Sequence, residues 1–282
     1  MIYPQEIYVM LLDSQVAFIG GGVMGEAMIK SLLRSGALKS EQIMLSEPNT
    51  DRRSLVSDRY EVHACADNAT CACQADVIVL SVKPQVMDKV LADLRGAIRP
   101  DALVFSIAAG ISIATLREGL GGHEPIVRVM PNTPAQIGQG ISVWTCTSAV
   151  TDLQREQAVQ ILKAMGEEVF VEEEEYLDMA TALSGTGPAY VFLFMEALID
   201  AGVHMGFSRP IAERLVIQTI RGSVEYAAAS KLHAAQLRNQ VTSPGGTTAA
   251  ALYQLEKGAF RTVISKAVWA AYERSVQLGR KQ

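Results

Sequence analysis

Apolar and polar positions follow two different rhythms along this chain, and the rhythm changes near residue 172. In the first half, short apolar runs alternate with stretches of helical spacing. The runs predict strands at 15–19, 42–46, 76–80, 102–107, 125–129, 141–145 and 167–171. The stretches predict helices at 23–35, 51–58, 85–95, 111–119 and 152–165. Such alternation is typical of α/β proteins with a doubly wound parallel sheet.

The second half shows helical spacing only. No convincing strand pattern follows Leu177, and helices are predicted at roughly 188–205, 208–230 and 244–278. The glutamates at 172–175 are most simply a solvated turn at the join between the halves. We therefore expect three parts: an N-terminal extension at 1–13, a Rossmann-like dinucleotide-binding domain at 14–172 and an all-α domain at 173–282.

The composition favours a cytoplasmic protein. The chain has 282 residues, 49% of them hydrophobic, which is enough for two ordinary cores. A net charge of −5 argues against a nucleic-acid partner. No uninterrupted apolar run reaches the ~18 residues of a membrane helix, and the first residues lack the basic region of a signal peptide. We therefore expect neither nucleic acid nor a membrane as a partner.

The cysteines and histidines do not predict a metal site. Cys65, Cys71 and Cys73 lie close together, but their spacing matches no recognised zinc motif. Because Cys71 and Cys73 precede the apolar run 76–80, we expect both to pack a helix against the sheet. The four histidines are scattered and nominate no catalytic base.

A glycine-rich turn links the first predicted strand to the first predicted helix. Gly20, Gly22 and Gly25 form the pattern G-x-G-x-x-G directly after the run 15–19. In this setting the glycines permit a tight turn, close approach of the backbone to a pyrophosphate, and close packing of helix on strand. The bare pattern often matches by chance, but the strand–turn–helix context favours a nicotinamide or flavin site over a structural glycine cluster.

The end of the second predicted strand bears on the choice of cofactor. Glu47 lies there, and a carboxylate at this position accepts hydrogen bonds from a ribose 2′-hydroxyl and repels a 2′-phosphate. Against that, Arg52 and Arg53 follow closely and could pair with a 2′-phosphate. We therefore expect the chain to use both NADP and NAD.

A second loop, Val241–Thr248, reads VTSPGGTT. Pro244 restricts one φ angle, the two glycines permit unusual turns, and residues 249–252 favour a helix. The amides of residues 245–248 should therefore lie at a helix N-terminus, which attracts a carboxylate or phosphate. Taken alone, the loop is equally well an ordinary helix cap. Together with the glycine turn, it predicts a reductase that acts on a small acid.

Several long strings resemble the pyrroline-5-carboxylate reductase family, from about residue 15 across nearly the whole chain. They are residues 20–25, 81–85 (SVKPQ), 106–110 (SIAAG), 128–134 (RVMPNTP), 183–190 (LSGTGPAY) and 241–248. Two positions depart from the family pattern. Thr186 replaces the usual Ser and keeps the hydroxyl, and Val23 replaces the Asn of many bacterial members in the cofactor turn.

The resemblance implies a Rossmann-like N-terminal domain, a helical dimerisation domain, and reduction of 1-pyrroline-5-carboxylate to L-proline, the last step of proline biosynthesis. Hydride would come from NADPH or NADH, and Glu47 suggests more use of NADH than is usual in the family. The resemblance also implies a homodimer, often stacked into rings of five dimers. Apolar and small residues at 219–229 fit a partner helix, although packing within the chain explains them equally well.

The resemblance also implies the residues of the site. Cofactor contacts are implied for Ile19, Gly20, Gly21, Gly22, Val23, Met24, Gly25, Glu47, Asn68, Ser81, Val82, Lys83, Pro84, Ala108, Ala109, Gly110 and Gln240. Substrate contacts are implied for Glu174, Gly245, Gly246, Thr247 and Thr248, and no metal is implied. Residues 81–84 have a simpler explanation as a strand-to-helix turn with Pro84 at the first helical position.

Thr248 is the implied catalytic residue, with its hydroxyl directed at the ring nitrogen of the substrate. An aliphatic hydroxyl is a poor acid, so we expect it to orient the ring and relay a proton. The simpler alternative is that Thr248 caps the following helix. Two other functions stay open at this point: a non-catalytic nucleotide-binding protein of the same fold, and a reductase of a six-membered cyclic imine. The intact loop at 241–248 favours an enzyme.

Overall fold

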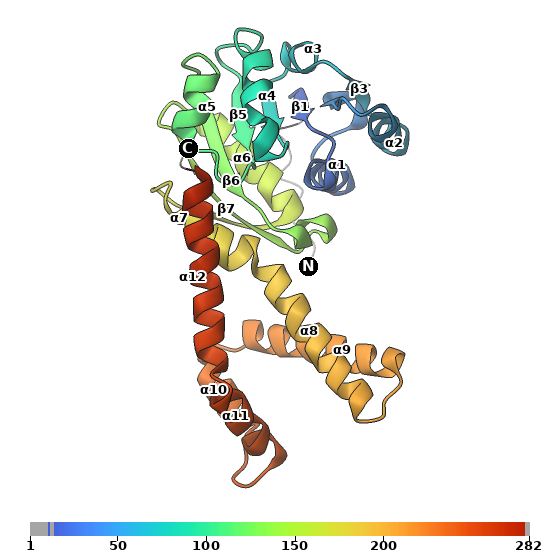
Figure 1. Ribbon diagram of the computed structural model, residues 1–282. Helices are drawn as coiled ribbons and strands as arrows, with labels where there is room; N and C mark the ends of the chain where they lie inside the picture. The colour runs from blue at the N-terminus through green and yellow to red at the C-terminus, as the bar shows by residue number, and fades with distance from the viewer. Residues whose placement is uncertain (1–10, 12–13, 280–282) are drawn as a thin grey trace. The chain divides into compact units, whose positions relative to one another are not determined.

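The computed structural model describes residue 11 and residues 14–279 (Figure 1). Most of the predicted extension at 1–13 therefore lies outside the described residues. Leu11 is the exception, because its side chain is fully buried in the core and its carbonyl oxygen accepts a hydrogen bond from Gln42 Nε2 at 3.0 Å. At this position the chain is attached to the first domain.

The described residues form one eight-stranded sheet with the order β3-β2-β1-β4-β5-β6-β7-β8. Its strands are β1 (Val16–Ile19), β2 (Ile43–Ser46), β3 (His63–Cys65), β4 (Val77–Leu80), β5 (Leu103–Ser106), β6 (Ile126–Met130), β7 (Gly140–Cys146) and β8 (Gly166–Phe170). From β3 to β6 all neighbours are parallel. The order reverses at β1, where the sheet is wound in both directions, as the alternating pattern predicted.

The sheet departs from the expected parallel arrangement at one edge. β7 pairs antiparallel with β6, and β8 runs parallel to β7. The connection from β6 to β7 comprises residues 131–139 and contains only the short 3-10 turn Thr133–Ile137. A parallel return needs a crossover of about a dozen residues or more, usually an α-helix, so this short connection turns the chain back. The apolar pattern of residues 141–145 carried no information on direction.

Seven helices accompany the sheet in the described part of the first half: α1 (Val23–Ser35), α2 (Thr50–Tyr60), α3 (Asn68–Ala72), α4 (Met87–Leu94), α5 (Ile113–Gly119), α6 (Asp152–Met165) and α7 (Tyr176–Ala180). Two apolar clusters hold α1 to α6 against the strands. Phe18 of β1 belongs to the cluster that includes α1 and α6, whereas Ala17 and Ile19 belong to the cluster that includes α3, α4 and α5. Helices therefore cover both faces of the sheet, as in doubly wound folds.

The cysteine expectation holds for one residue and fails for another. Cys71 is fully buried in the second cluster, and burial raises the pKa of its thiol strongly. Cys73, which we also expected against the sheet, is exposed because it lies just beyond α3 and faces away from the cluster. Within residue 11 and residues 14–279, no group of three His, Cys, Asp or Glu residues could hold a metal ion.

The chain divides into two compact units. The first comprises the residues up to Thr186 together with the chain from Ala271 onward, and the second comprises Gly187–Ala270. The division falls later in the sequence than the expected join between 172 and 173, which stays a prediction. The remaining helices are α8 (Gly187–His204), α9 (Arg209–Ala229), α10 (Ala234–Gln240), α11 (Thr247–Lys257) and α12 (Phe260–Gly279).

A single helix over 244–278 was predicted, and this is wrong. Residues 244–246 form a turn before α11, and the helix breaks at Gly258 and Ala259, where Ala259 has a positive φ of 57°. The apolar spacing continues through the break, so the sequence pattern did not reveal it.

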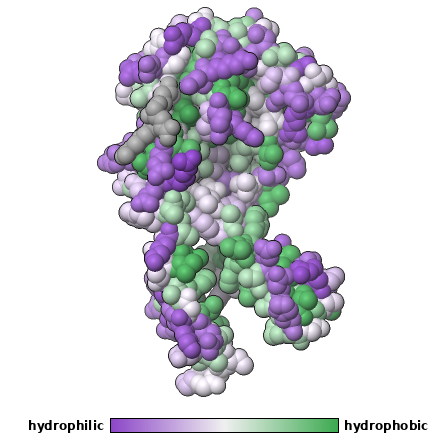
Figure 2. Space-filling view, viewed as in Figure 1, coloured by the Kyte–Doolittle hydropathy of each residue, from purple (hydrophilic) through white to green (hydrophobic). Residues whose placement is uncertain are grey.

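Within the second unit, α8 packs against α9 at the small residues Gly202 and Ala212. A Cβ on Gly202 would lie 3.1 Å from the Cβ of Ala212, so glycine permits the close approach of the two helices. Many large apolar side chains of this unit are exposed, and Figure 2 shows hydrophobic residues on the surface of its helices. By length and composition alone, the continuous helical stretch Tyr176–His204 could cross a membrane. This was not predicted, because polar residues interrupt the apolar runs within the stretch.

Candidate functional site

The glycine turn between β1 and α1 has the geometry of a dinucleotide-binding turn. Gly20 has a φ of 103°, and a Cβ there would lie 2.8 Å from Val82 Cγ1. A Cβ on Gly25 would lie 2.4 Å from the carbonyl oxygen of Gly20. A Cβ on Gly22 would meet nothing within 4 Å, so the backbone is open on that side. The first and third glycines permit tight packing, and the second leaves a cradle that fits a pyrophosphate.

Three of the expected cofactor segments lie along the same edge of the sheet. Ile19 pairs with Leu80, and Leu80 pairs with Ser106, so β1, β4 and β5 end side by side. The glycine turn, residues 81–84 and residues 108–110 follow these three ends. Ser81 links two of the segments, because its hydroxyl donates to the carbonyl oxygen of Gly20 at 2.8 Å. Ligands of doubly wound folds bind at this carboxyl edge.

Residues 81–84 form the expected strand-to-helix turn. Pro84 is the first residue of the 3-10 turn Pro84–Val86, with Lys83 at its N-cap. Ser81 and Val82 are half-buried and Lys83 is exposed. Ala108 and Gly110 are buried, and Gly110 has a positive φ of 73°. A Cβ on Gly110 would lie 3.0 Å from the Cβ of Leu278, so this glycine permits close packing of the segment against the end of the chain.

Glu47 lies directly beside the glycine turn. Its Oε2 accepts a hydrogen bond from the amide of Gly21 at 2.9 Å, and its Oε1 accepts from the amide of Asn49 at 3.0 Å. Asn68 belongs to the neighbouring segment, since its Oδ1 accepts from the hydroxyl of Ser46 at 2.7 Å. The two residues expected at the adenosine end of the cofactor thus lie at the ends of neighbouring strands, β2 and β3.

The two arginines that could read a 2′-phosphate are engaged inside the protein. Arg52 Nε donates to the carbonyl oxygen of Gly21 at 2.6 Å, and its Nη2 donates to Glu26 Oε2 at 2.5 Å. Arg53 Nη1 donates to the carbonyl oxygen of Glu47 at 2.7 Å. Both guanidinium groups therefore already hold the turn region together, a role that the sequence did not indicate.

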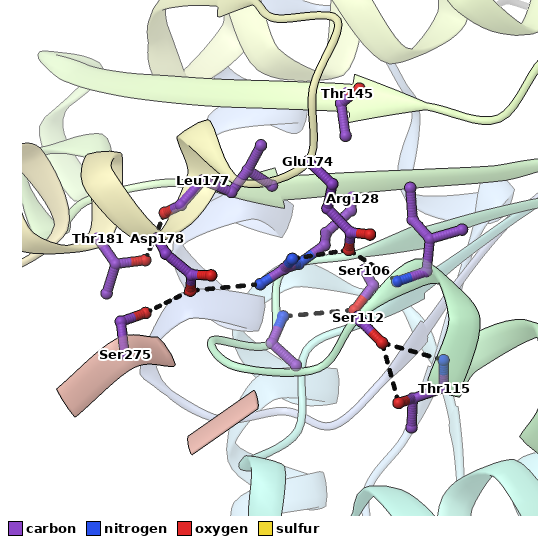
Figure 3. A network of polar contacts seen from close by, with 12 residues as sticks. Ser106, Ser112, Thr115, Arg128, Thr145, Glu174, Leu177, Asp178, Thr181 and Ser275 are labelled. Carbon is purple, nitrogen blue, oxygen red and sulfur yellow. Dashed lines mark hydrogen bonds and ion pairs between the residues drawn. The ribbon is translucent and has the colours of Figure 1, made fainter. Parts of the chain in front are cut away.

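Glu174 takes part in a partly buried polar network around the buried Arg128, whereas its neighbours Glu172, Glu173 and Glu175 are exposed (Figure 3). Its Oε1 accepts from Arg128 Nη1 at 2.7 Å and from the amide of Ile113 at 2.8 Å. Arg128 is only 5% exposed, and its Nη2 lies 3.9 Å from Asp178 Oδ1. The hydroxyl of Ser275 donates to the same oxygen of Asp178 at 2.6 Å. A buried guanidinium needs such partners, because leaving it unpaired costs several kcal/mol.

This network connects β6, α5, α7 and the C-terminal end of α12. A small cavity of about 210 Å³ adjoins it, lined by Gly110, Ser112, Arg128, Glu174, Glu175, Asp178, Val276 and Gly279. The family resemblance includes Arg128 in the string at 128–134 but implies no role for it. The one available signal was an arginine inside an otherwise apolar strand, a position where a charge requires a partner.

The second predicted loop forms a helix N-terminus, as expected. Gly245 has a φ of 71°, Gly246 is the N-cap of α11, and Thr247 is its first helical residue. The amides in the first turn of a helix have no partner four residues earlier within that helix, so they can bind an anion. Thr248 is half-buried and lies one residue inside the helix. Because Gly246 occupies the N-cap without a side-chain hydrogen bond, Thr248 does not cap the helix.

Gln240, expected at the cofactor, is the last residue of α10 in the second unit. Its Oε1 accepts from the hydroxyl of Tyr226 on α9 at 3.2 Å. The expected residues thus fall into two groups. Those from Ile19 to Gly110, with Glu174, belong to the first unit, and Gln240 with residues 245–248 belongs to the second.

The doubly wound sheet, the glycine turn and the carboxylate after β2 define a Rossmann-type dinucleotide-binding fold with an added helical region. Residues 15–110 match the family model described as NADP oxidoreductase, coenzyme F420-dependent. Residues 174–278 match the model described as pyrroline-5-carboxylate reductase dimerisation.

Relatives match almost from end to end. The pyrroline-5-carboxylate reductase of Synechocystis is 44% identical over 96% of this chain and 100% of its own. That of Pseudomonas aeruginosa is 41% identical over 95% and 97%. The crystal structure of Plasmodium falciparum pyrroline carboxylate reductase with NADP bound has a TM-score of 0.88 at 35% identity, covering 95% of this chain and 99% of that one. The chain belongs to the pyrroline-5-carboxylate reductase family.

Proposed function

We propose that this chain is an NAD(P)H-dependent oxidoreductase that reduces the cyclic C=N bond of 1-pyrroline-5-carboxylate to give L-proline, the last step of proline biosynthesis. Family membership over nearly the whole chain carries the proposal. The open cradle at Gly22, beside the carboxyl ends of β1 and β4, supports its cofactor part. A non-catalytic protein of the same fold would have no need of the intact anion loop in the second unit.

The first unit would bind the cofactor. The proposed contacts are Ile19, Gly20, Gly21, Gly22, Val23, Met24, Gly25, Glu47, Asn68, Ser81, Val82, Lys83, Pro84, Ala108, Ala109 and Gly110, with Gln240 from the second unit. When bound, the reduced nicotinamide supplies the hydride. The amides at the start of α1 would hold the pyrophosphate, because they lie at a helix N-terminus.

The first turn of α11 would hold the substrate. Gly245, Gly246 and Thr247 would donate their amides to the substrate carboxylate, for which the amide of Gly246 would exchange its 3.1 Å hydrogen bond to the carbonyl oxygen of Ser243. Thr248 would direct its hydroxyl at the ring nitrogen. The nitrogen gains a proton during reduction, and the Thr248 hydroxyl would orient it and relay that proton. Glu174 belongs to the same proposal as a carboxylate held in place by Arg128 and Ile113.

The dimerisation match supports a homo-oligomer. We extend this to a homodimer formed by the helices of the second unit, and to a ring in which five such dimers stack. In that assembly a second copy would cover the exposed apolar side chains of α8 and α9. This accounts for the apolar stretch Tyr176–His204 without a membrane, and we place the enzyme in the cytoplasm.

The direct test is oxidation of NADPH and of NADH by the purified chain with 1-pyrroline-5-carboxylate, followed as loss of nicotinamide absorbance, with L-proline identified as the product. Both cofactors should be oxidised only when the imine is present. A parallel assay with the six-membered imine tests ring size, because one methylene is worth only ~1–3 kcal/mol in a pocket. Binding of both cofactors without turnover of either imine would contradict the proposed reaction.

A further inference from the structure

Glu26 is the centre of a charged cluster behind the glycine turn. It lies in the first turn of α1, one residue after Gly25, and its side chain is 16% exposed. Oε2 accepts from Arg52 Nη2 at 2.5 Å, and Oε1 accepts from Arg59 Nη1 at 2.7 Å and from the hydroxyl of Tyr60 at 2.9 Å. Three side chains of α2 therefore converge on one carboxylate of α1.

Arg52 connects this cluster to the turn itself. While Nη2 is bonded to Glu26, Nε donates to the carbonyl oxygen of Gly21 at 2.6 Å. The amide of the same glycine donates to Glu47. Gly21 is thus held through its amide by the residue that follows β2, and through its carbonyl by Arg52. The guanidinium of Arg52 lies at the end of the site where the 2′-position of the adenosine ribose belongs in this fold.

We infer that Glu26 determines cofactor preference indirectly, as a positioning residue that holds Arg52 on the turn and neutralises its charge. The inference rests on the proposed NAD(P)H-dependent function. A guanidinium directed at a 2′-phosphate favours NADPH. Because Glu26 occupies Arg52, that guanidinium contributes little to a 2′-phosphate, and Glu47 acts against the phosphate beside it.

The electrostatics of the cluster agree with this arrangement. Burial alone would raise the pKa of Glu26, but the hydrogen bonds from Arg52, Tyr60 and Arg59 outweigh it and leave the pKa below its ordinary value. The carboxylate is therefore ionised at neutral pH, and its charge opposes that of Arg52. Removing only the charge of Glu26 should free Arg52 for a bound phosphate.

The test is direct binding of NADPH and NADH, measured by nicotinamide fluorescence without substrate. In Glu26→Gln, the ratio of the Kd for NADPH to that for NADH should fall about tenfold, the size of one charge-assisted hydrogen bond. In Glu26→Gln with Arg52→Gln, the ratio should return to the wild-type value. Asp58→Asn, at an exposed position of the same helix α2, is the matched control for net charge and should leave the ratio unchanged.

Two results would overturn the inference. One is an equal loss of affinity for both cofactors in Glu26→Gln, which would make Glu26 a purely structural support of the turn. The other is an equal change of ratio in Asp58→Asn, which would reflect general charge.

If Glu26→Gln does not fold, the single variant Arg52→Gln decides. Its ratio of Kd values should stay within about twofold of wild type, and a tenfold rise would overturn the inference, because Arg52 would then already bind the phosphate. Wild-type protein that bound neither cofactor would instead contradict the proposed function.

Discussion

The two compact units place their apolar side chains in opposite ways. In the first unit, Trp144, Phe18 and Phe105 are fully buried between the sheet and its helices. In Gly187–Ala270, only Gly202 and Ala212 are buried, whereas large side chains such as Leu193 and Phe192 are more than half exposed. A soluble monomer rarely exposes that much apolar surface. The first unit therefore has a hydrophobic core of its own, whereas the exposed apolar side chains of the second unit need another protein surface to cover them.

We expect the largest effect from replacing an exposed leucine by aspartate in the second unit, compared with the same replacement in the first unit. Leu193 in α8 is 67% exposed and Leu153 in α6 is 52% exposed, so the chain alone gives no reason to expect different outcomes. We expect Leu193→Asp to weaken dimerisation by at least about a hundredfold and to abolish activity, because a charge would be buried in the interface. Leu153→Asp should change stability by less than about 0.5 kcal/mol. Light scattering and sedimentation measure the assembly.

An active Leu193→Asp dimer with wild-type affinity would show that this face of α8 is free. An active, folded wild-type monomer at micromolar concentration would show that the second unit is stable with its apolar surface exposed.

The next effect concerns the core of the first unit. Phe105 in β5 is fully buried, so Phe105→Ala should lower the free energy of unfolding of the first unit by about 3–5 kcal/mol. The loss should not depend on protein concentration, since this core lies within one chain. Denaturant unfolding at several concentrations tests this. A Phe105→Ala effect that vanished at high concentration would mean that the first unit also depends on its partner.

Much of the first unit was predictable because its signals are local. The glycine turn, Pro84 at the start of its 3-10 turn and the alternation of strands with helices follow from backbone preferences and apolar periodicity. The direction of β7 was not predictable from periodicity, because it depends on the length of the connection before it. The partners of Arg128 were not either, since Glu174 lies 46 positions away in sequence and only the fold brings the two together.

The second unit was predictable as helical but not in detail. Its apolar spacing continues through the helix break at Ala259, which is marked by the positive φ of that residue and not by a change in the apolar pattern. Exposure was the other failure, because a sequence cannot distinguish a helix face that packs in its own chain from one that packs on a second copy. The start of a helix after Gly245 and Gly246, by contrast, was correctly predicted from these glycines and the helix-favouring alanines that follow.

The third prediction concerns Thr248, whose loss should affect catalysis without affecting the stability of the second unit. We expect Thr248→Ala to lower kcat by roughly tenfold to a thousandfold, because the hydroxyl would orient the ring nitrogen and relay a proton to it. The melting temperature should hardly change, since Gly246 and not Thr248 is the N-cap of α11. Thr248→Ser keeps the hydroxyl and is the matched control, with most of kcat retained. Near-full kcat in Thr248→Ala would remove Thr248 from the mechanism.

The smallest effect comes from a buried histidine of the first unit. His123 Nε2 donates to the carbonyl oxygen of Ala102 at 2.8 Å, and burial lowers its pKa below 6.5, although that bond and the charge of Glu124 oppose the shift. In the unfolded chain His123 binds its proton near pH 6.5, whereas in the folded protein it binds only at lower pH. The free energy of unfolding should therefore fall as the pH drops below 6.5.

Between about pH 7.5 and about pH 5.5, the melting temperature of His123→Gln should fall less than that of wild type, by on the order of 1–2 °C. His63→Gln, at an exposed position of β3, should follow the wild type. Identical pH profiles for His123→Gln and wild type would mean that the ring is as easily protonated in the folded first unit as in water.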